Sequence, residues 1–147
     1  PPWFENVGKR LVKSPKVYVR DAGLLHVLLN LPRRADLESH PKFGASWEGF
    51  ALEEVLRRVG SRNAYFWATH GGAELDLLVN LRGKRWGFEF KCHDAPGMTK
   101  SLHSALADLK LTRAWIVHPG KGAYPVHERV ECIGLSELVR VCKLITR

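Results

Sequence analysis

The chain has 147 residues, 45% of them hydrophobic and 26% charged, and its 23 lysines and arginines exceed its 15 acidic residues to give a net charge of +8. This composition excludes a disordered tail, and the length suits one domain with a substantial core. The odd cysteine count (Cys92, Cys132 and Cys142, without a C-x-x-C pair) argues against a disulfide framework or a structural zinc site, and no apolar run is long enough to span a membrane.

We therefore expect a cytoplasmic protein without a membrane anchor. The positive charge favours a polyanionic partner such as DNA, while ordinary solubility stays the plain alternative.

The predicted elements follow from apolar periodicity and from the positions of proline and glycine. In chain order they are a strand at 16–21, a short helix at 22–31, a loop at 32–44, a helix at 46–59, a strand at 64–69, strands at 73–79 and 84–91, a helix at 98–110, a strand at 113–118, a loop at 119–125, a strand at 127–133 and a helix at 136–143. From Ser46 the order is α-β-β-β-α-β with one more strand and helix. Three strands joined by turns and then a helical crossover predict an α/β fold with a mixed sheet flanked by helices.

Two acidic residues stand out in "AELDLLVNLRGKRWGFEFKC", residues 73–92. With Arg82-Gly83 as the turn of a hairpin, Asp76 lies opposite Glu89. The same register places Glu74 opposite Lys91. Strand alternation predicts one apolar face and one charged face. On the apolar face we expect Ala73, Leu75, Leu77, Val79, Trp86, Phe88 and Phe90, and on the charged face Glu74, Asp76, Gly87, Glu89 and Lys91.

Opposed carboxylates repel each other, so Asp76 and Glu89 need a neutralising partner. Mg²⁺ binds through one or two carboxylates and completes its shell with water and substrate phosphate. Lys91 would then lie beside the ion. The alternative is a solvated face with two exposed acids and a Glu74–Lys91 ion pair.

A third acid, Glu48, lies on the predicted helix at 46–59. It shares a helical stripe with Leu52, Val55 and Val59, which predicts that it faces the core. Nearby charges are expected on the outer faces of the helix, and these are Glu53, Glu54, Arg57 and Arg58. The alternative is a first-turn glutamate that complements the helix dipole, with Ser46 as the N-cap.

A helix with "GASWEGF", a strand with "AELDLLV" and a strand with "GFEFK" together resemble the PD-(D/E)XK nuclease fold. The resemblance implies a restriction-endonuclease-like αβββαβ core and a metal site formed by Glu48, Asp76, Glu89 and the carbonyl of Phe90, with Lys91 as a catalytic residue. Leu75 stands where the family's name has proline.

A wider pattern, "RLVKSPKVYVRDAGLLHVLL", "WEGFALEEVLRR", "YFWATHGGAELDLLV", "GFEFK" and "WIVHPG", resembles the C-terminal domain of uncharacterised prokaryotic AAA-type ATPases. The resemblance implies an ATPase module upstream, which agrees with the absence of an initiator Met and of a P-loop motif in this chain. Residues 1–43 would connect to that module and residues 44–147 would form the nuclease-like domain.

The resemblance implies an Mg²⁺- or Mn²⁺-dependent endodeoxyribonuclease in which the metal activates water and offsets the charge that develops on the phosphate. Six basic residues are candidate contacts to the DNA backbone: Arg57, Arg58, Arg62, Arg82, Lys84 and Lys100. A non-catalytic module of the same fold, serving DNA binding, protein interaction or regulation of the ATPase, stays open. The oligomeric state is open as well.

Overall fold

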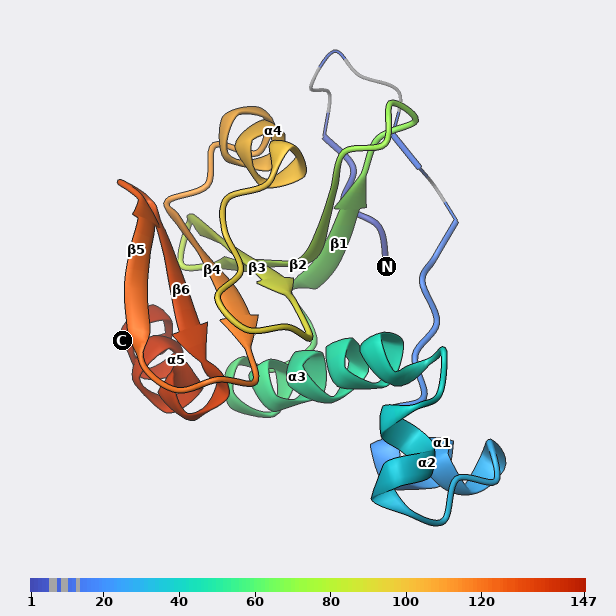
Figure 1. Cartoon of the computed structure of the whole chain (residues 1–147). Coiled ribbons are helices and arrows are strands. Elements are labelled where there is room, and N and C mark those ends of the chain that lie inside the picture. Colours follow the sequence, from blue (N-terminus) through green and yellow to red (C-terminus); the bar gives the residue numbers. More distant parts are fainter. Residues whose placement is uncertain (6–7, 9–10, 13) are drawn as a thin grey trace.

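The structure is a computed structural model of the chain, and it describes residues 1–5, 8, 11–12 and 14–147. A six-stranded mixed sheet lies between two layers of helices (Figure 1). Helix α4 covers one face of the sheet, and α3 and α5 cover the other. The predicted α/β fold class is therefore confirmed.

In the part of the chain that the structure describes, three helices come first, and two groups of three strands, separated by one helix, precede the C-terminal helix. They are α1 (Ala22–Leu28), α2 (Arg34–Glu38), α3 (Phe43–Val59), β1 (Ala64–Ala68), β2 (Glu74–Leu81), β3 (Lys84–Phe90), α4 (Lys100–Asp108), β4 (Arg113–His118), β5 (Ala123–His127), β6 (Val130–Gly134), a 3₁₀ turn η1 (Leu135–Glu137) and α5 (Leu138–Thr146).

The strand order in the sheet is β1-β2-β3-β4-β6-β5. The first three strands are antiparallel neighbours, as expected for strands joined by turns. Strands β3 and β4 are parallel because α4 carries the chain back across the sheet. Strand β6 continues the parallel part, and β5 closes the edge as an antiparallel strand.

The turn between β2 and β3 fixes the register that the sequence predicts. Arg82 and Gly83 both have positive φ angles, 54° and 72°, as a two-residue hairpin turn requires. The paired residues run from Leu81–Lys84 to Leu77–Phe88. In every pair the two residue numbers add up to 165, which is the register that a turn at Arg82-Gly83 predicts. Asp76 and Glu89 occupy the next positions beyond this ladder.

The core consists of two apolar clusters, one on each face of the sheet. On the α3 and α5 side, Trp115 stacks between Trp86 and Phe88, with ring centroids 5.9 Å and 5.3 Å away. On the α4 side, an added Cβ on Gly87 would lie 2.8 Å from Leu111 Cδ1. The predicted alternation of β3 is therefore confirmed. The prediction that the face with Gly87 is a charged one is wrong there, because a second apolar cluster under α4 covers it.

Several elements differ from the sequence prediction. Helix α3 begins at Phe43 with Lys42 as its N-cap, so Ser46 is a helical residue and not the cap. Its hydroxyl oxygen instead lies 2.7 Å from Nε2 of His26. Helix α2 forms inside the predicted loop at 32–44, because Arg33 and Asp36 build a local capping interaction.

The predicted loop at 119–125 contains the start of β5. This strand lies at the sheet edge, where Pro125 is tolerated because an edge strand needs hydrogen bonds on one side only. The predicted strand at 127–133 is accordingly divided between the end of β5 and β6.

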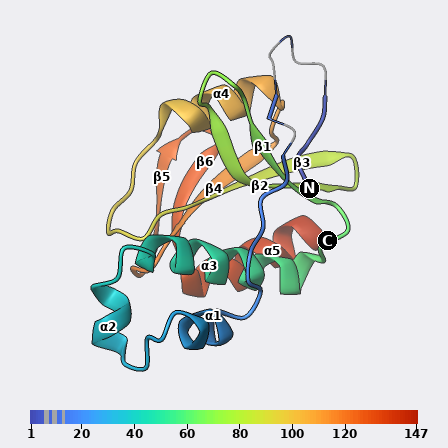
Figure 2. The same ribbon diagram turned by 90° about the vertical axis from the view of Figure 1, so that its right-hand side faces the viewer.

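The predicted strand at 16–21 does not form. Residues 15–19 belong to no regular element, although they run past α3 toward α1. Helices α1 and α2 lie below α3 on the side away from the sheet (Figure 2). Among the described residues, no helix combines the length and apolar composition that crossing a membrane requires.

Candidate functional site

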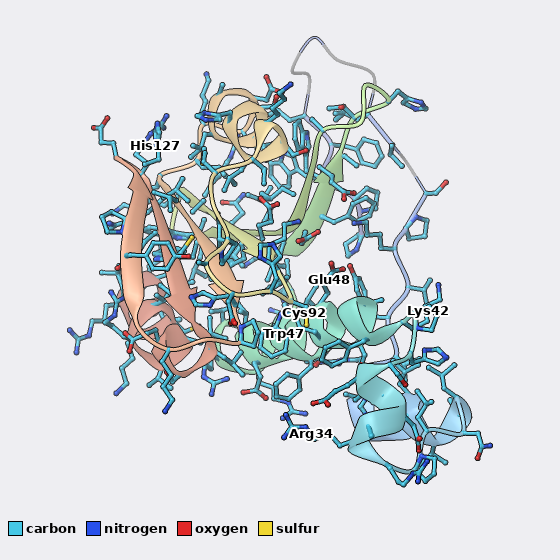
Figure 3. All side chains as sticks on the ribbon, viewed as in Figure 1. Arg34, Lys42, Trp47, Glu48, Cys92 and His127 are labelled. Carbon is cyan, nitrogen blue, oxygen red and sulfur yellow. The ribbon has the colours of Figure 1, made fainter. Side chains whose placement is uncertain are left out.

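The carboxylates singled out above lie where β2 begins and β3 ends, opposite the first half of α3. Figure 3 shows Glu48 on the side of α3 that faces the sheet. Asp76 and Glu89 are 8% and 5% exposed, so both are buried. The alternative of two ordinary solvated acids is therefore wrong for this pair.

A β-bulge places Asp76. Tyr65 pairs with Leu78 and Trp67 pairs with Leu75, so two residues of β2, Asp76 and Leu77, lie opposite the single residue between them on β1. The bulge reverses the alternation at this point. Leu75 thus joins the α4-side cluster while Leu77 joins the α3-side cluster. The prediction that Leu75 and Leu77 share a face is wrong for this reason.

Within the described part of the chain, the Asp76 carboxylate has two partners. Its Oδ2 accepts a hydrogen bond of 3.0 Å from the backbone N–H of Phe90. Its Oδ1 lies 3.9 Å from Nζ of Lys16. Burial nevertheless raises the pKa of Asp76 above its usual value, against the lowering by the Phe90 hydrogen bond and by Lys16. The contacts with Phe90 and Lys16 therefore do not fully offset the cost of burying the ionised Asp76 carboxylate.

The Glu89 carboxylate is held by residues that follow it in the sequence. Lys91 Nζ lies 2.9 Å from Oε1 of Glu89. The hydroxyl of Thr99 donates to Oε2 at 3.2 Å, and it also accepts from the N–H of Leu102 as the N-cap of α4. Thr99, which sequence reasoning missed, therefore ties Glu89 to the start of α4.

The expected Glu74–Lys91 pair is not formed. Glu74 is exposed and instead accepts a hydrogen bond of 3.3 Å from Lys16. Lys91 turns toward Glu89, whose carboxylate is buried and pairs with no other cation among the residues that the structure describes.

Glu48 is half-buried and belongs to the same electrostatic cluster. Burial raises its pKa, the charge of Asp76 raises it further, and Lys91 and Lys16 act in the opposite direction. The structure thus brings together Glu48, Asp76, Glu89 and Lys91, as the sequence predicts. It adds Lys16 and Tyr18, which sequence reasoning missed.

The signal for these two additional residues was present in the sequence. The alternation in "KVYVR" (16–20) marks one side of the segment as polar, and this side carries Lys16, Tyr18 and Arg20. The ring of Tyr18 packs against Gly49. Arg20 forms two hydrogen bonds of 2.8 Å and 3.0 Å with Glu53. Glu53 is therefore buried beneath the segment, and the prediction that it faces outward is wrong.

The donor set suits a hard cation. Among the residues that the structure describes, no three histidine, cysteine, aspartate or glutamate side chains gather closely enough to hold a metal ion by themselves. A closed zinc-type site is thereby unsupported. Mg²⁺ needs only one or two carboxylates with water and phosphate, and Asp76 and Glu89 supply oxygen donors of that kind. The amide N–H of Phe90 bonds directly to Asp76, which keeps the Phe90 backbone beside these carboxylates.

Five of the six predicted DNA contacts lie away from the carboxylates. Lys84 and Glu89 are five positions apart on β3, about 17 Å along the strand. Arg82 lies in the turn beyond Lys84, Arg57 and Arg58 pair with Glu54 near the end of α3, and Arg62 follows that helix. Lys100 is the exception among the six, since it directly follows Thr99.

The buried charge of Asp76 predicts a stability effect with a definite sign. Because the folded pKa of Asp76 is raised, ionised Asp76 destabilises the fold at neutral pH, and this penalty disappears below the unfolded pKa of about 3.9. In metal-free buffer, Asp76→Asn should raise the melting temperature by a few degrees at pH 7 and by almost nothing at pH 3.5. Thermal unfolding of both proteins across this range checks the prediction. A lower melting temperature of the variant at pH 7 would mean that the contact with Lys16 outweighs burial.

Fold and site together define a class: an α/β domain with a buried carboxylate–lysine cluster at the end of a β-hairpin. The chain belongs to the DUF4143 family, described as a domain of unknown function, which matches residues 43–138. A second domain of unknown function, DUF8612, matches residues 1–35.

The curated relatives are uncharacterized proteins. Mb2031c of Mycobacterium bovis and Rv2008c of Mycobacterium tuberculosis are each 46% identical to this chain over 138 residues. The match covers 94% of this chain but 31% of either relative, so the chain spans about a third of their length. No solved structure matches the chain.

Proposed function

We propose that this domain is an Mg²⁺-dependent nuclease-like module that hydrolyses DNA phosphodiester bonds as part of a larger ATPase. The observation that carries the proposal is the burial of Asp76 and Glu89 beside Lys91. Burying charged groups costs free energy that a structural domain has no reason to spend. The greater length of the relatives is compatible with an additional ATPase module.

Asp76, Glu89 and the carbonyl oxygen of Phe90 would hold the metal ion, with Glu48 as a further ligand. When bound, Mg²⁺ or Mn²⁺ lowers the pKa of a coordinated water and neutralises negative charge on the phosphate.

Lys91 supplies a positive charge rather than a general base. Its burial opposes the charged form, but the hydrogen bond and charge of Glu89 outweigh this and raise the pKa of Lys91. The ammonium group therefore stays protonated at neutral pH and attracts the phosphate. Glu48, whose pKa is raised by burial, is better suited to accept a proton from water than an ordinary exposed glutamate.

The proposal is tested by nicking of supercoiled plasmid and cleavage of branched DNA in Mg²⁺ or Mn²⁺. We expect metal-dependent cleavage by the wild-type chain that stops with a chelator and is lost in Asp76→Asn. Measuring a cooperative melting transition of the variant is the control that it is folded. Cleavage that survives equally in the variant would come from elsewhere and would contradict the assignment.

Two observations favour the second candidate, a non-catalytic interaction or regulatory module of the ATPase. The carboxylates are already paired with Lys16 and Lys91, which provide neutralisation without an ion. Apolar side chains of α1 are also exposed, among them Val27 and Leu28 at 74% and 68%. Absence of cleavage together with binding to the ATPase module or to DNA would support this candidate.

A further inference from the structure

A short segment before α1 crosses the carboxylate site. Residues 14–20 adopt no helix or strand, and within the described part of the chain no backbone hydrogen bond is found for them. Their contacts are made by side chains: Lys16 contacts Glu74 and Asp76, Tyr18 packs on Gly49, and Arg20 pairs with Glu53.

The opposite side of the segment is open. Val17 is 90% exposed and Val19 is 39% exposed. The segment therefore rests on the protein by the side that carries Lys16, Tyr18 and Arg20, without the backbone pairing that fixes a strand.

An ion pair anchors each end of the segment, Lys16 also lies over the ring of Phe66, and Tyr18 packs against the apolar cluster on the α3 side. The Lys16 contacts are weak and readily exchanged, because partly exposed ion pairs contribute little free energy. The two hydrogen bonds of Arg20 to buried Glu53 hold the other end more firmly.

Lys16 supplies the positive charge beside Asp76 that a bound cation would otherwise supply. Its Nζ lies between two carboxylates, 3.3 Å from Glu74 Oε2 and 3.9 Å from Asp76 Oδ1. A divalent ion on Asp76 would face this ammonium group at short range, and the two positive charges would repel each other. Either Lys16 moves away or the ion binds more weakly.

We propose that Lys16 sets the divalent-ion affinity of the site by competing with the ion for Asp76, and that ion binding releases the Lys16 end of the segment, residues 14–17. The inference rests on the metal site of the proposed function but not on DNA cleavage. It separates two lysines: Lys91 follows directly after β3 and bonds Glu89 at 2.9 Å, whereas Lys16 comes from a segment held by side chains.

The first test is calorimetric titration of the chain with Mn²⁺, comparing wild type, Lys16→Met and Lys121→Met. Lys121 is an exposed loop lysine and controls for the loss of one positive charge. Lys16→Met should bind Mn²⁺ about tenfold more tightly than wild type, while Lys121→Met should differ little. Unchanged or weaker binding by Lys16→Met, or no binding at all, would overturn the proposal.

The second test reads the position of the segment directly. Trypsin must take the Lys16 side chain into its own acidic pocket, so it can cleave after Lys16 only when the side chain leaves Asp76 and Glu74. Mn²⁺ should accelerate this cleavage severalfold without changing cleavage after Lys121. A rate after Lys16 that does not respond to Mn²⁺ would show that the Lys16 end of the segment is not released.

These outcomes are independent of nuclease activity. Tighter Mn²⁺ binding by Lys16→Met without any DNA cleavage would leave the inference intact and remove the nuclease proposal. Metal-dependent cleavage with equal Mn²⁺ affinity in wild type and Lys16→Met would support the nuclease proposal and overturn the inference about Lys16.

Discussion

Lys91→Met is expected to lower the turnover rate of DNA cleavage at least about a hundredfold without weakening metal binding. The ammonium group of Lys91 lies 2.9 Å from Glu89 and remains protonated, so it can stabilise negative charge on the reacting phosphate. Removing one such preorganised charge typically costs two to three orders of magnitude in turnover. Cleavage rates measured at several Mg²⁺ concentrations separate turnover from metal half-saturation.

Two further substitutions show whether the effect is specific to the charge of Lys91. Lys91→Arg keeps the charge and should retain part of the activity, and Lys121→Met should keep nearly all of it. If Lys91→Met cleaves DNA at the wild-type rate while folded, Lys91 has no part in the reaction and the role assigned to it is wrong.

Trp115→Ala is expected to destabilise the fold by about 3–5 kcal/mol. The side chain is fully buried in the middle of β4, stacks on Trp86 and Phe88, and donates its indole N–H to Glu131 at 3.3 Å. Its removal leaves a cavity between the sheet and the helices α3 and α5. Urea unfolding followed by circular dichroism measures the change in the free energy of unfolding.

Phe4→Ala is the matched control, because it also truncates an aromatic side chain but one that is largely exposed. It should change the free energy of unfolding by less than about 1 kcal/mol. Equal effects of the two substitutions would show that Trp115 is not at the centre of the core.

The sheet was predictable where local rules fix it. Arg82-Gly83 can be identified as a hairpin turn, and the turn alone sets which residues of β2 and β3 face each other. The apolar residues at alternate positions of β3 then fix the alternation of its side chains. The burial of Glu89 could not be predicted in this way, because it depends on Thr99 at the start of α4 as well as on Lys91.

The bulge in β2 could not be predicted, because it depends on the register between two strands and not on either strand alone. Leu75 and Leu77 are both apolar, so the pattern gives no sign that they face opposite layers. Yet this irregularity is what turns Asp76 toward the Phe90 backbone and the cavity that Leu52 and Leu56 of α3 help to line.

The segment at 14–20 shows the converse error. Its alternation predicts a strand, but a strand needs a neighbouring strand to pair with, and none of the described residues forms a backbone hydrogen bond with this segment. The polar side of the alternation instead lies on α3 and the carboxylates. The buried position of Glu53 was missed for the same reason, since it depends on Arg20 arriving from a distant part of the chain.

Binding of Mn²⁺ to the wild-type chain, to Glu89→Gln and to Glu128→Gln, followed by calorimetry or electron paramagnetic resonance, tests the carboxylate cluster most directly. Glu128 is an exposed glutamate outside the site, so Glu128→Gln controls for the loss of one negative charge. We predict one Mn²⁺ per chain in wild type and Glu128→Gln, and binding weakened more than about tenfold in Glu89→Gln. No binding by the wild-type chain, or equal binding by all three folded proteins, would contradict a metal site at Asp76 and Glu89.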